Sequence, residues 1–281
     1  MKILIDDLPI YYDVRGEGIP LVILHGFLLD HEIMLGAFEP LFAERDDFQR
    51  IYVDMPGMGR TPARDDLCSS DAIIELMIKF VDKILDHNPF CLAGFSYGGY
   101  IARGVLKARQ SQVEGLYLIA PSVNSADNTR NLPESMVIVR DETATQLLPD
   151  ELAPMILQTL SVQTRPVIQR IIDEFMQSFP RADQEFLTKL RGTENFSYHP
   201  NIDKLNTPFD KPALILTGRH DNNTGYYDAF QLLENYTRAS YATLDRAGHG
   251  VYLEQDTLYK ALTHEWLDRV GETIGMKQPV G

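Results

Sequence analysis

Short apolar runs alternate with longer segments of helical period along most of the chain. Gly, Pro or Asp bounds these runs, and from the third run onward they are almost continuously apolar, as expected of strands that are covered on both faces. The alternation predicts an α/β fold with a mostly parallel sheet and helices on both of its faces. The expected strands are residues 2–5, 10–15, 21–24, 50–54, 90–93, 115–119, 213–217 and 240–244.

The first two runs are separated by the short turn Asp6-Asp7-Leu8-Pro9, which predicts an antiparallel hairpin at one edge of the sheet. Helices are expected at residues 69–85, 97–107 and 258–270, where apolar residues recur every three or four positions. Ser69 stands where a side-chain cap would begin the first of these helices.

One long segment breaks the alternation between strands and helices. From residue 123 to about 209 there is no good strand pattern, but prolines separate helical patterns at 150–160, 165–179 and 183–191. This segment is interpreted as an insertion. Its apolar residues are expected to form the core of a lid or, for some of them, the wall of a pocket: Met155, Ile156, Leu157, Ile171, Ile172, Phe175, Met176 and Phe186. The predicted organisation is a core of residues 1–122 and 209–281 with a helical lid at residues 123–208.

The composition of the 281-residue chain narrows the classes of function. With 26 Lys and Arg against 40 Asp and Glu, the net charge is −14, which disfavours nucleic acids and anionic membrane surfaces as partners. No apolar run approaches the roughly 18 residues of a spanning helix, and the first ten residues lack the pattern of a signal peptide. Two cysteines form no disulfide framework, so a reducing, cytoplasmic location is predicted.

The strongest chemical signal is the motif Gly94-Phe95-Ser96-Tyr97-Gly98, placed between an apolar strand and a helix. A nucleophilic serine has to stand at a sharp turn, with its hydroxyl exposed and the next backbone N–H aimed at the developing oxyanion. Small residues at both ends of the turn permit this tightness. The motif also occurs by chance in turns that bind phosphate or nothing, and it is the position after the strand that favours Ser96 as a nucleophile.

A serine needs a positioned base, and the base needs a carboxylate to orient it. Asp221 follows the run at 213–217, and His249 lies between two glycines after the last run. A serine nucleophile at a sharp turn between a strand and a helix, called a nucleophile elbow, is followed along the chain by the acid and then by the histidine. The chain order Ser96, Asp221, His249 agrees with this. Other nearby residues are alternatives: for the acid, Asp228 and Asp245; for the base, His220 and His264.

The loop after the third strand, His25-Gly26-Phe27, is the expected second wall of an oxyanion hole. The backbone N–H groups of Phe27 and Tyr97 are the predicted donors, with Leu28 as the alternative to Phe27. His25 itself is expected to hold the loop by hydrogen bonds. The seven histidines and two cysteines show no metal-ligand spacing, so neither a metal nor another cofactor is predicted.

The chain resembles the α/β-hydrolase-fold serine hydrolases that carry a helical lid. The resemblance rests on the following segments in the family's order: His25-Gly26, Asp54-Met-Pro-Gly57-Met-Gly59, Gly94-Phe-Ser96-Tyr-Gly98-Gly99, Gly218-Arg-His-Asp221 and Gly248-His249. It implies an eight-stranded sheet in which only the second strand is antiparallel, a lid inserted after the sixth strand, and a structural role for the Asp54 segment. Relatives that open epoxides or remove halogen carry Asp at the elbow, so Ser96 disfavours those activities.

The predicted function is cleavage of a carboxylic ester, or a related acyl bond, in a small to medium, largely apolar molecule. The small-molecule substrate is the only partner expected, and the chain is expected to act as a monomer or homodimer. The same triad also serves C–C bond hydrolases, amidases or iminopeptidases, and perhydrolases or lyases. A hydrolase-fold receptor or signalling partner with little turnover would have a similar sequence, because fold does not determine function.

Overall fold

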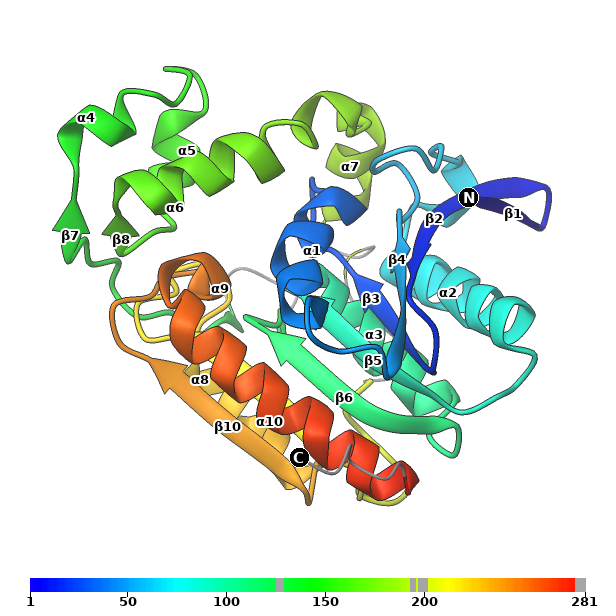
Figure 1. Ribbon diagram of the computed structural model, residues 1–281. Helices are drawn as coiled ribbons and strands as arrows, with labels where there is room; N and C mark the ends of the chain where they lie inside the picture. The colour runs from blue at the N-terminus through cyan, green and yellow to red at the C-terminus, as the bar shows by residue number, and fades with distance from the viewer. Residues whose placement is uncertain (125–128, 193–195, 197–201, 276–281) are drawn as a thin grey trace.

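The computed structural model describes residues 1–124, 129–192, 196 and 202–275. Within these residues, eight strands form one sheet in the order β1-β2-β4-β3-β5-β6-β9-β10 (Figure 1). Only β2 runs antiparallel to its neighbours, and each predicted strand range overlaps an observed strand, so the predicted sheet is confirmed. The strands are β1 (Lys2–Ile5), β2 (Leu8–Arg15), β3 (Ile19–Leu24), β4 (Phe48–Val53), β5 (Phe90–Phe95), β6 (Val113–Ile119), β9 (Ala213–Gly218) and β10 (Ala239–Leu244).

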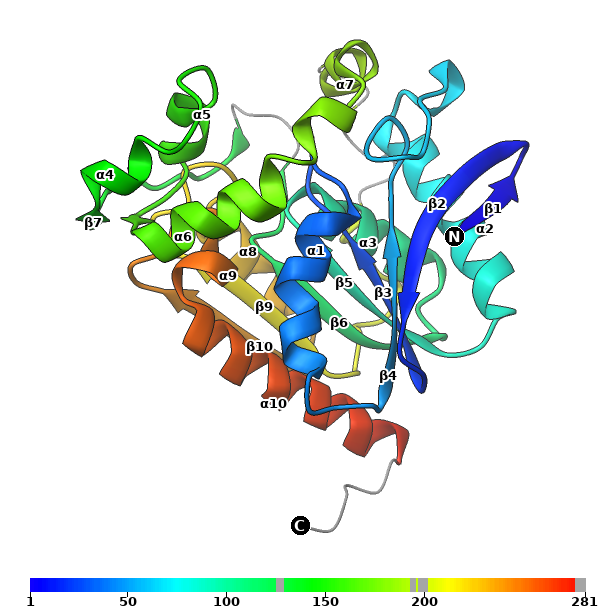
Figure 2. The same cartoon turned by 45° about the horizontal axis from the view of Figure 1, so that its top comes forward.

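Helices cover both faces of this sheet (Figures 1 and 2). One face carries α1 (His31–Phe38), α9 (Val251–Glu254) and α10 (Asp256–Ile274). On the other face lie α2 (Ser70–Leu85), α3 (Tyr97–Ala108) and α8 (Tyr227–Gln231). Shorter 3-10 turns occupy Glu39–Phe42, Asp65–Leu67 and Leu232–Glu234.

Alternation of side chains along the central strands divides the core into two layers. On β3, Leu21 and Ile23 pack toward α1 and α10, whereas Val22 and Leu24 pack toward α2 and α3. These four side chains are almost completely buried, which stabilises the fold by roughly 1.5–3 kcal/mol for each side chain. The sheet is therefore a well-packed support for the loops at its carboxyl edge.

The insertion between β6 and β9 lies over that edge (Figure 2). Its described elements are β7 (Val139–Arg140), α4 (Glu142–Thr145), α5 (Ala153–Leu157), β8 (Val162–Gln163), α6 (Arg165–Arg170), a π-helical turn at Ile171–Phe175, a 3-10 turn at Phe179–Arg181, and α7 (Gln184–Arg191). The limits of the lid at 123–208 stay a prediction, since residues 125–128, 193–195 and 197–201 fall outside the described part.

Two details of the insertion differ from the sequence-based expectation. The expectation of no strand was wrong, because β7 and β8 form a two-stranded parallel sheet, too short to leave an alternating pattern. The helical pattern at 165–179 is divided into α6, the π-helical turn and a further turn that ends before Pro180. The helix expected at 183–191 is present as α7, with Asp183 as its side-chain cap.

A buried arginine holds both ends of the insertion against the core. Arg103 on α3 is 1% exposed and donates through Nη1 to the carbonyl of Ser122, 2.7 Å away. Its Nε donates to a carboxylate oxygen of Asp203 at 2.8 Å. A second contact lies further along, where the Ser178 hydroxyl donates to Asp30 at 2.8 Å. Polar contacts thus hold the insertion to α3, through Arg103, and to the start of α1, through Asp30.

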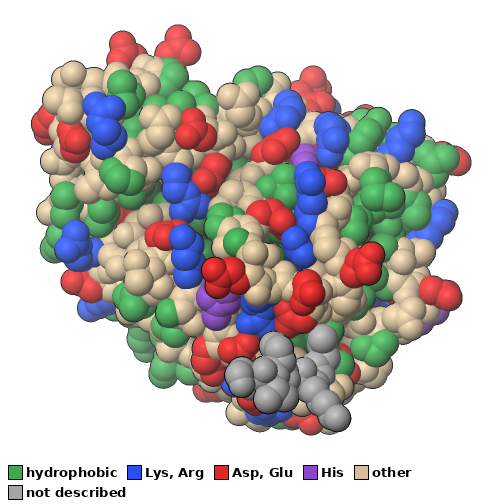
Figure 3. All heavy atoms as spheres, in the orientation of Figure 1, with side chains coloured by type: hydrophobic (Ala, Val, Ile, Leu, Met, Phe, Trp, Pro, Cys, Tyr) green, Lys and Arg blue, Asp and Glu red, His purple; other side chains and the backbone are tan. Residues whose placement is uncertain are grey.

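The distribution of surface charge and the character of the helices show whether the protein has an acidic patch or a membrane-spanning helix. Acidic and basic side chains are intermixed over the face seen in Figure 3, so on that face the net charge of −14 does not form one acidic patch. Among the described residues, no helix combines the length and the apolar character needed to cross a membrane.

Candidate active site

Ser96 stands at a sharp turn between β5 and α3. Its backbone φ of 53° and ψ of −116° lie in a region that residues with a Cβ seldom adopt. The close approach of chains requires glycine on both sides: a Cβ on Gly94 would lie 2.4 Å from the carbonyl oxygen of Gly98, and a Cβ on Gly98 would lie 2.3 Å from that of Leu24. The turn therefore holds the Ser96 hydroxyl clear of the sheet.

The structure brings Ser96, His249 and Asp221 into one hydrogen-bonded chain. The Ser96 Oγ lies 3.0 Å from the His249 Nε2, and the His249 Nδ1 lies 2.9 Å from the Asp221 Oδ2. A carboxylate only accepts, so Nδ1 carries the proton and Nε2 is free to accept one from the serine hydroxyl. These are the three residues that the sequence places in a triad.

Asp221 is held in its ionised form. It is fully buried, and burial alone would raise the pKa of its carboxyl group. The charge of His249 and the hydrogen bonds from His249 and Thr224 outweigh burial and keep that pKa below its usual value. The backbone N–H groups of Asn223 and Thr224 donate to Oδ1 at 2.9 and 3.0 Å, and the Thr224 hydroxyl donates to Oδ2 at 2.7 Å.

The alternative acids and bases lie elsewhere. His220 and Asp245 face each other at 3.4 Å in a separate pair, in which Asp245 is largely exposed. Asp228 accepts hydrogen bonds from the side chains of Asn124 and Asn131. His264 is on α10. None of these residues lies among those that the structure places around Ser96.

The loop residue Phe27 approaches the elbow as the sequence predicts. Its ring contacts that of Tyr97 edge-on, with centroids 5.7 Å apart, and both residues line the cavity at Ser96. Within the described chain, the backbone N–H groups of Phe27, Leu28 and Tyr97 have no intramolecular acceptor. They are available to a ligand oxygen, although Leu28, with φ of 69°, stays the alternative to Phe27.

His25 lies beneath this loop and is fully buried. Its Nδ1 is 2.8 Å from the Gly26 carbonyl, and its Nε2 accepts from the backbone N–H of Met55 at 3.0 Å. Burial lowers the pKa of the imidazole, so His25 is a neutral link between two loops. This is the structural role that the sequence predicts.

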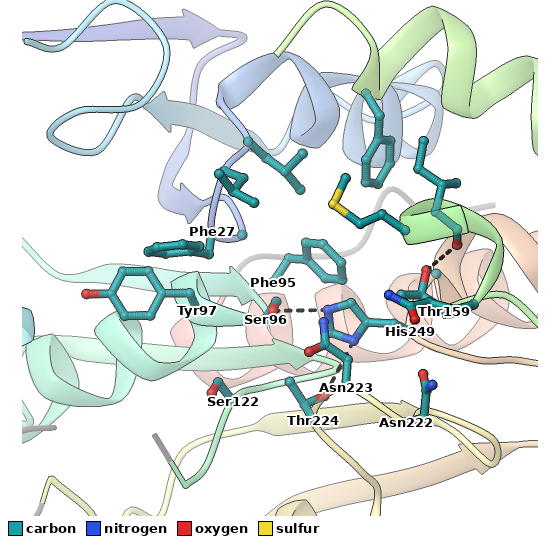
Figure 4. A pocket seen from close by; sticks show the side chains of 18 of the residues that line it. Phe27, Phe95, Ser96, Tyr97, Ser122, Thr159, Asn222, Asn223, Thr224 and His249 are labelled. Atoms are coloured by element: carbon teal, nitrogen blue, oxygen red, sulfur yellow. Dashed lines mark hydrogen bonds between the residues drawn. The ribbon is translucent and has the colours of Figure 1, made fainter. Parts of the chain in front are cut away.

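A cavity of about 360 Å³ opens at Ser96 and His249, between the sheet edge and the insertion. Figure 4 shows both side chains pointing toward each other at its floor. Apolar side chains form much of the wall, and the insertion supplies the following residues to it: Met155, Ile156, Leu160, Ile171, Phe175 and Phe179. Polar side chains also line the cavity: Ser122, Asn222, Asn223 and Thr224 lie on the other side from the insertion, and Thr159 belongs to the insertion itself.

Sequence reasoning identified only part of this wall. Four apolar residues that it proposed as lid core or pocket do line the cavity: Met155, Ile156, Ile171 and Phe175. Asn222 and Asn223 were missed. Their position directly after Asp221 was an available signal, because all loops at the carboxyl edge of a parallel sheet converge there.

No group of three or more His, Cys, Asp or Glu side chains in the described ranges is arranged to hold a metal ion. Within the described residues, the arrangement brings together a serine hydroxyl, a histidine nitrogen that can accept its proton, and N–H groups without an intramolecular acceptor, which are the parts needed for attack on a carbonyl group.

The fold and this site define the class of protein. A model of the alpha/beta hydrolase family matches residues 21–261, and the chain belongs to that family. The resemblance noted in the sequence is thereby confirmed.

Relatives with named activities are distant. The chain is 24% identical to monoacylglycerol lipase ABHD6 of Bos taurus over 97% of this chain and 83% of that protein. It is also 24% identical to the pimeloyl-[acyl-carrier protein] methyl ester esterase of Legionella pneumophila (strain Paris), over 92% and 99% of the two chains. The crystal structure of an alpha/beta superfamily hydrolase from Oenococcus oeni PSU-1 superimposes with a TM-score of 0.86 at 24% identity, over 96% and 99% of the chains.

Proposed function

We propose that the protein is a serine hydrolase that cleaves a carboxylic ester of a small to medium, largely apolar substrate through an acyl-enzyme. The observation that carries the proposal is the hydrogen-bonded chain of Asp221, His249 and Ser96 at the floor of a cavity. Two of the named relatives are a lipase and a methyl ester esterase, which supports an ester as the substrate.

In the proposed mechanism, Ser96 Oγ attacks the ester carbonyl while His249 Nε2 takes the hydroxyl proton. The carbonyl oxygen becomes an oxyanion that accepts hydrogen bonds from the N–H groups of Phe27 and Tyr97. His249 then gives its proton to the leaving alcohol, and the C–O bond breaks to leave an acylated Ser96. A water molecule repeats the sequence, giving the carboxylic acid and free Ser96.

The walls of the cavity support a largely apolar acyl group. The apolar side chains of the proposed lid, residues 123–208, lie over Ser96, whereas the Asn222 and Asn223 side chains lie beside His249 (Figure 4). The leaving alcohol has to approach His249, because that residue donates its proton. We therefore place the alcohol on the polar side and the acyl group beneath the lid.

No other macromolecule is needed for this reaction, and we propose a small-molecule substrate with a monomer or homodimer as the acting form. Both cysteines, Cys68 and Cys91, are free thiols, and this supports the proposed cytoplasmic location.

A second candidate is C–C bond hydrolysis of a dicarboxylate by the same triad. Two arginines, Arg130 and Arg191, line the cavity and could face a carboxylate of the substrate. Arg130 is held in place by the carbonyl groups of Asn124 and Asn223, at 2.8 and 3.0 Å.

The test is a substrate panel of p-nitrophenyl acetate, butyrate and octanoate, together with a dienoic diketo acid, on the wild-type protein and on Ser96→Ala. We expect ester turnover that Ser96→Ala abolishes, and labelling of the wild type by a fluorophosphonate at one mole per mole. Ser122→Ala is the matched control, because Ser122 lines the same cavity. Unchanged ester turnover in Ser96→Ala would overturn the proposal, and turnover of the diketo acid alone would favour the second candidate.

A further inference from the structure

Glu254, the last residue of α9, is a buried carboxylate that the mechanism does not use. It is 8% exposed and accepts three backbone hydrogen bonds. Its Oε1 accepts from Ser161 N–H at 2.6 Å and from Val162 N–H at 2.8 Å, and its Oε2 accepts from Gly248 N–H at 2.7 Å. No lysine or arginine within the described part of the chain forms an ion pair with it.

The three donors come from two segments that meet at the candidate base. Gly248 directly precedes His249, whereas Ser161 and Val162 belong to the insertion, where the chain enters β8. A further link lies beside them, because the backbone N–H of His249 donates to the Thr159 carbonyl at 2.8 Å. The backbone of His249 is thus fastened to the insertion by the Glu254 carboxylate and by a backbone hydrogen bond.

We propose that Glu254 is a positioning residue, which in its ionised form fixes the His249 loop and the insertion segment Thr159–Val162 against each other. The inference rests on the proposed function, since it concerns the geometry of the same base. It predicts that the insertion governs the position of His249 as well as the shape of the cavity wall.

Only a carboxylate satisfies all three donors. It presents two oxygens that accept, whereas a glutamine or a protonated glutamic acid turns one of its two polar atoms into a donor that faces an N–H group. At least one of the three hydrogen bonds is then lost, and a buried donor is left unpaired. The three hydrogen bonds that join the His249 loop to the insertion therefore depend on the charge of the Glu254 side chain.

The surroundings place the titration of this group near neutral pH. Burial raises the pKa of Glu254 to about 7 against the effect of its three backbone hydrogen bonds, and the negative charge of Asp221 adds to the rise. The other charged groups on the neighbouring elements are directed elsewhere. On α6, Arg170 faces Glu174 and Asp256, and Asp256 on α10 also faces Lys260. On the His249 loop, Asp245 and Arg246 are exposed, and the segment Ser161–Gln163 carries no charge.

The proposal is tested by the rate of labelling with a fluorophosphonate between pH 5 and 9, and by kcat and KM for acetyl and octanoyl esters. In the wild type, reactivity requires both a proton-free Nε2 on the base and an ionised Glu254, so the logarithmic slope of its loss toward acid exceeds one. In Glu254→Gln we expect kcat to fall on the order of 10- to 100-fold for both esters, with a slope of one. Glu265→Gln is the matched control, because it removes one exposed carboxylate from α10 and should leave both quantities unchanged.

Each outcome decides the matter. Wild-type kcat and slope in Glu254→Gln would overturn the inference. So would a loss confined to KM of the octanoyl ester, because Glu254 would then hold only the cavity wall. If Glu254→Gln fails to fold, the test uses the slope of the labelling rate against pH in the wild type. A slope of one on the acid side would then overturn the proposal. Failure of the proposed function itself is recognised separately, by labelling that persists in Ser96→Ala.

Discussion

The Nδ1 of His249 lies 2.9 Å from the Oδ2 of Asp221, and this carboxylate is completely buried. Asp221 thereby selects the tautomer in which Nε2 faces Ser96. We expect Asp221→Asn to lower kcat on the order of 10⁴-fold, because an amide NH₂ placed opposite Nδ1 favours the wrong tautomer. The measurement is steady-state hydrolysis of p-nitrophenyl butyrate, with circular dichroism to show that the variant is folded.

Asp245→Asn is the matched control for this change. Asp245 also follows a strand and also faces a histidine, His220, at 3.4 Å. Its substitution should leave kcat within twofold of the wild type. Equal losses in the two variants would mean that the acid has been assigned incorrectly.

The elbow glycine Gly98 provides a second prediction. A Cβ at this position would lie 2.3 and 2.4 Å from the carbonyl oxygens of Leu24 and His25, which are backbone atoms that cannot rotate away. We expect Gly98→Ala to lower both kcat/KM, by more than about 100-fold, and the melting temperature. Gly271→Ala is the control, since a Cβ on Gly271 meets nothing within 4 Å. Because Gly271 lies in helix α10, its replacement by alanine should raise the free energy of unfolding by about 0.5–1 kcal/mol. Wild-type kcat/KM and melting temperature in Gly98→Ala would contradict the steric argument.

The sheet and the three proposed catalytic residues were predictable from the sequence because each leaves a local signal. Buried parallel strands are continuous apolar runs, and the turn at Ser96 needs glycines two residues to either side. Asp221 and His249 follow strands at the edge where the chain places its loops. In each case the residues that form the strand or the turn are neighbours in the sequence, so the pattern can be recognised without knowledge of the fold.

Features that depend on contacts between distant segments were not predictable. The strands β7 and β8 are each two residues long, and the backbone at the start of β8 donates to the side-chain carboxylate of Glu254, which lies about ninety residues further along the chain. Glu254 itself looks like an ordinary helix residue in the sequence. Its burial and its three donors exist only when the insertion lies against the His249 loop.

Phe175 leads to a prediction about substrate size. Its side chain lies in the π-helical turn of the insertion and lines the cavity above Ser96. Phe175→Ala should enlarge the apolar wall, and we expect KM for the butyryl ester to rise several-fold while kcat for the acetyl ester stays within twofold. The lost burial is about 1 kcal/mol for an acyl chain that contacts the ring, which corresponds to that several-fold change. Phe230→Ala, which truncates a half-exposed ring on α8, is the control, and the same change in KM there would remove Phe175 from the pocket assignment.

Asp54 makes stability depend on pH through a buried cluster close to the elbow. It accepts hydrogen bonds from the backbone and the Nδ1 of His31, at 3.1 and 2.7 Å, and from the backbone of Arg60 at 3.1 Å. Burial alone would raise the pKa of Asp54, but the hydrogen bond and charge of His31 outweigh it and lower that pKa from 3.8 to about 2. Because the pKa is lower in the folded state, the stabilisation is complete above the unfolded value and disappears as the pH falls through the folded one.

The expected size follows from this difference in pKa between the folded and unfolded states. A lowering from 3.8 to about 2 corresponds to about 2 kcal/mol of the free energy of unfolding at neutral pH. Asp54→Asn should therefore reduce the free energy of unfolding in urea by about that amount at pH 7, and by progressively less between pH 4 and 2. Asp46→Asn removes the same charge from an exposed loop and should show no such trend. A penalty for Asp54→Asn that is constant with pH would mean that Asp54 contributes through the shape of its hydrogen bonds and not through its charge.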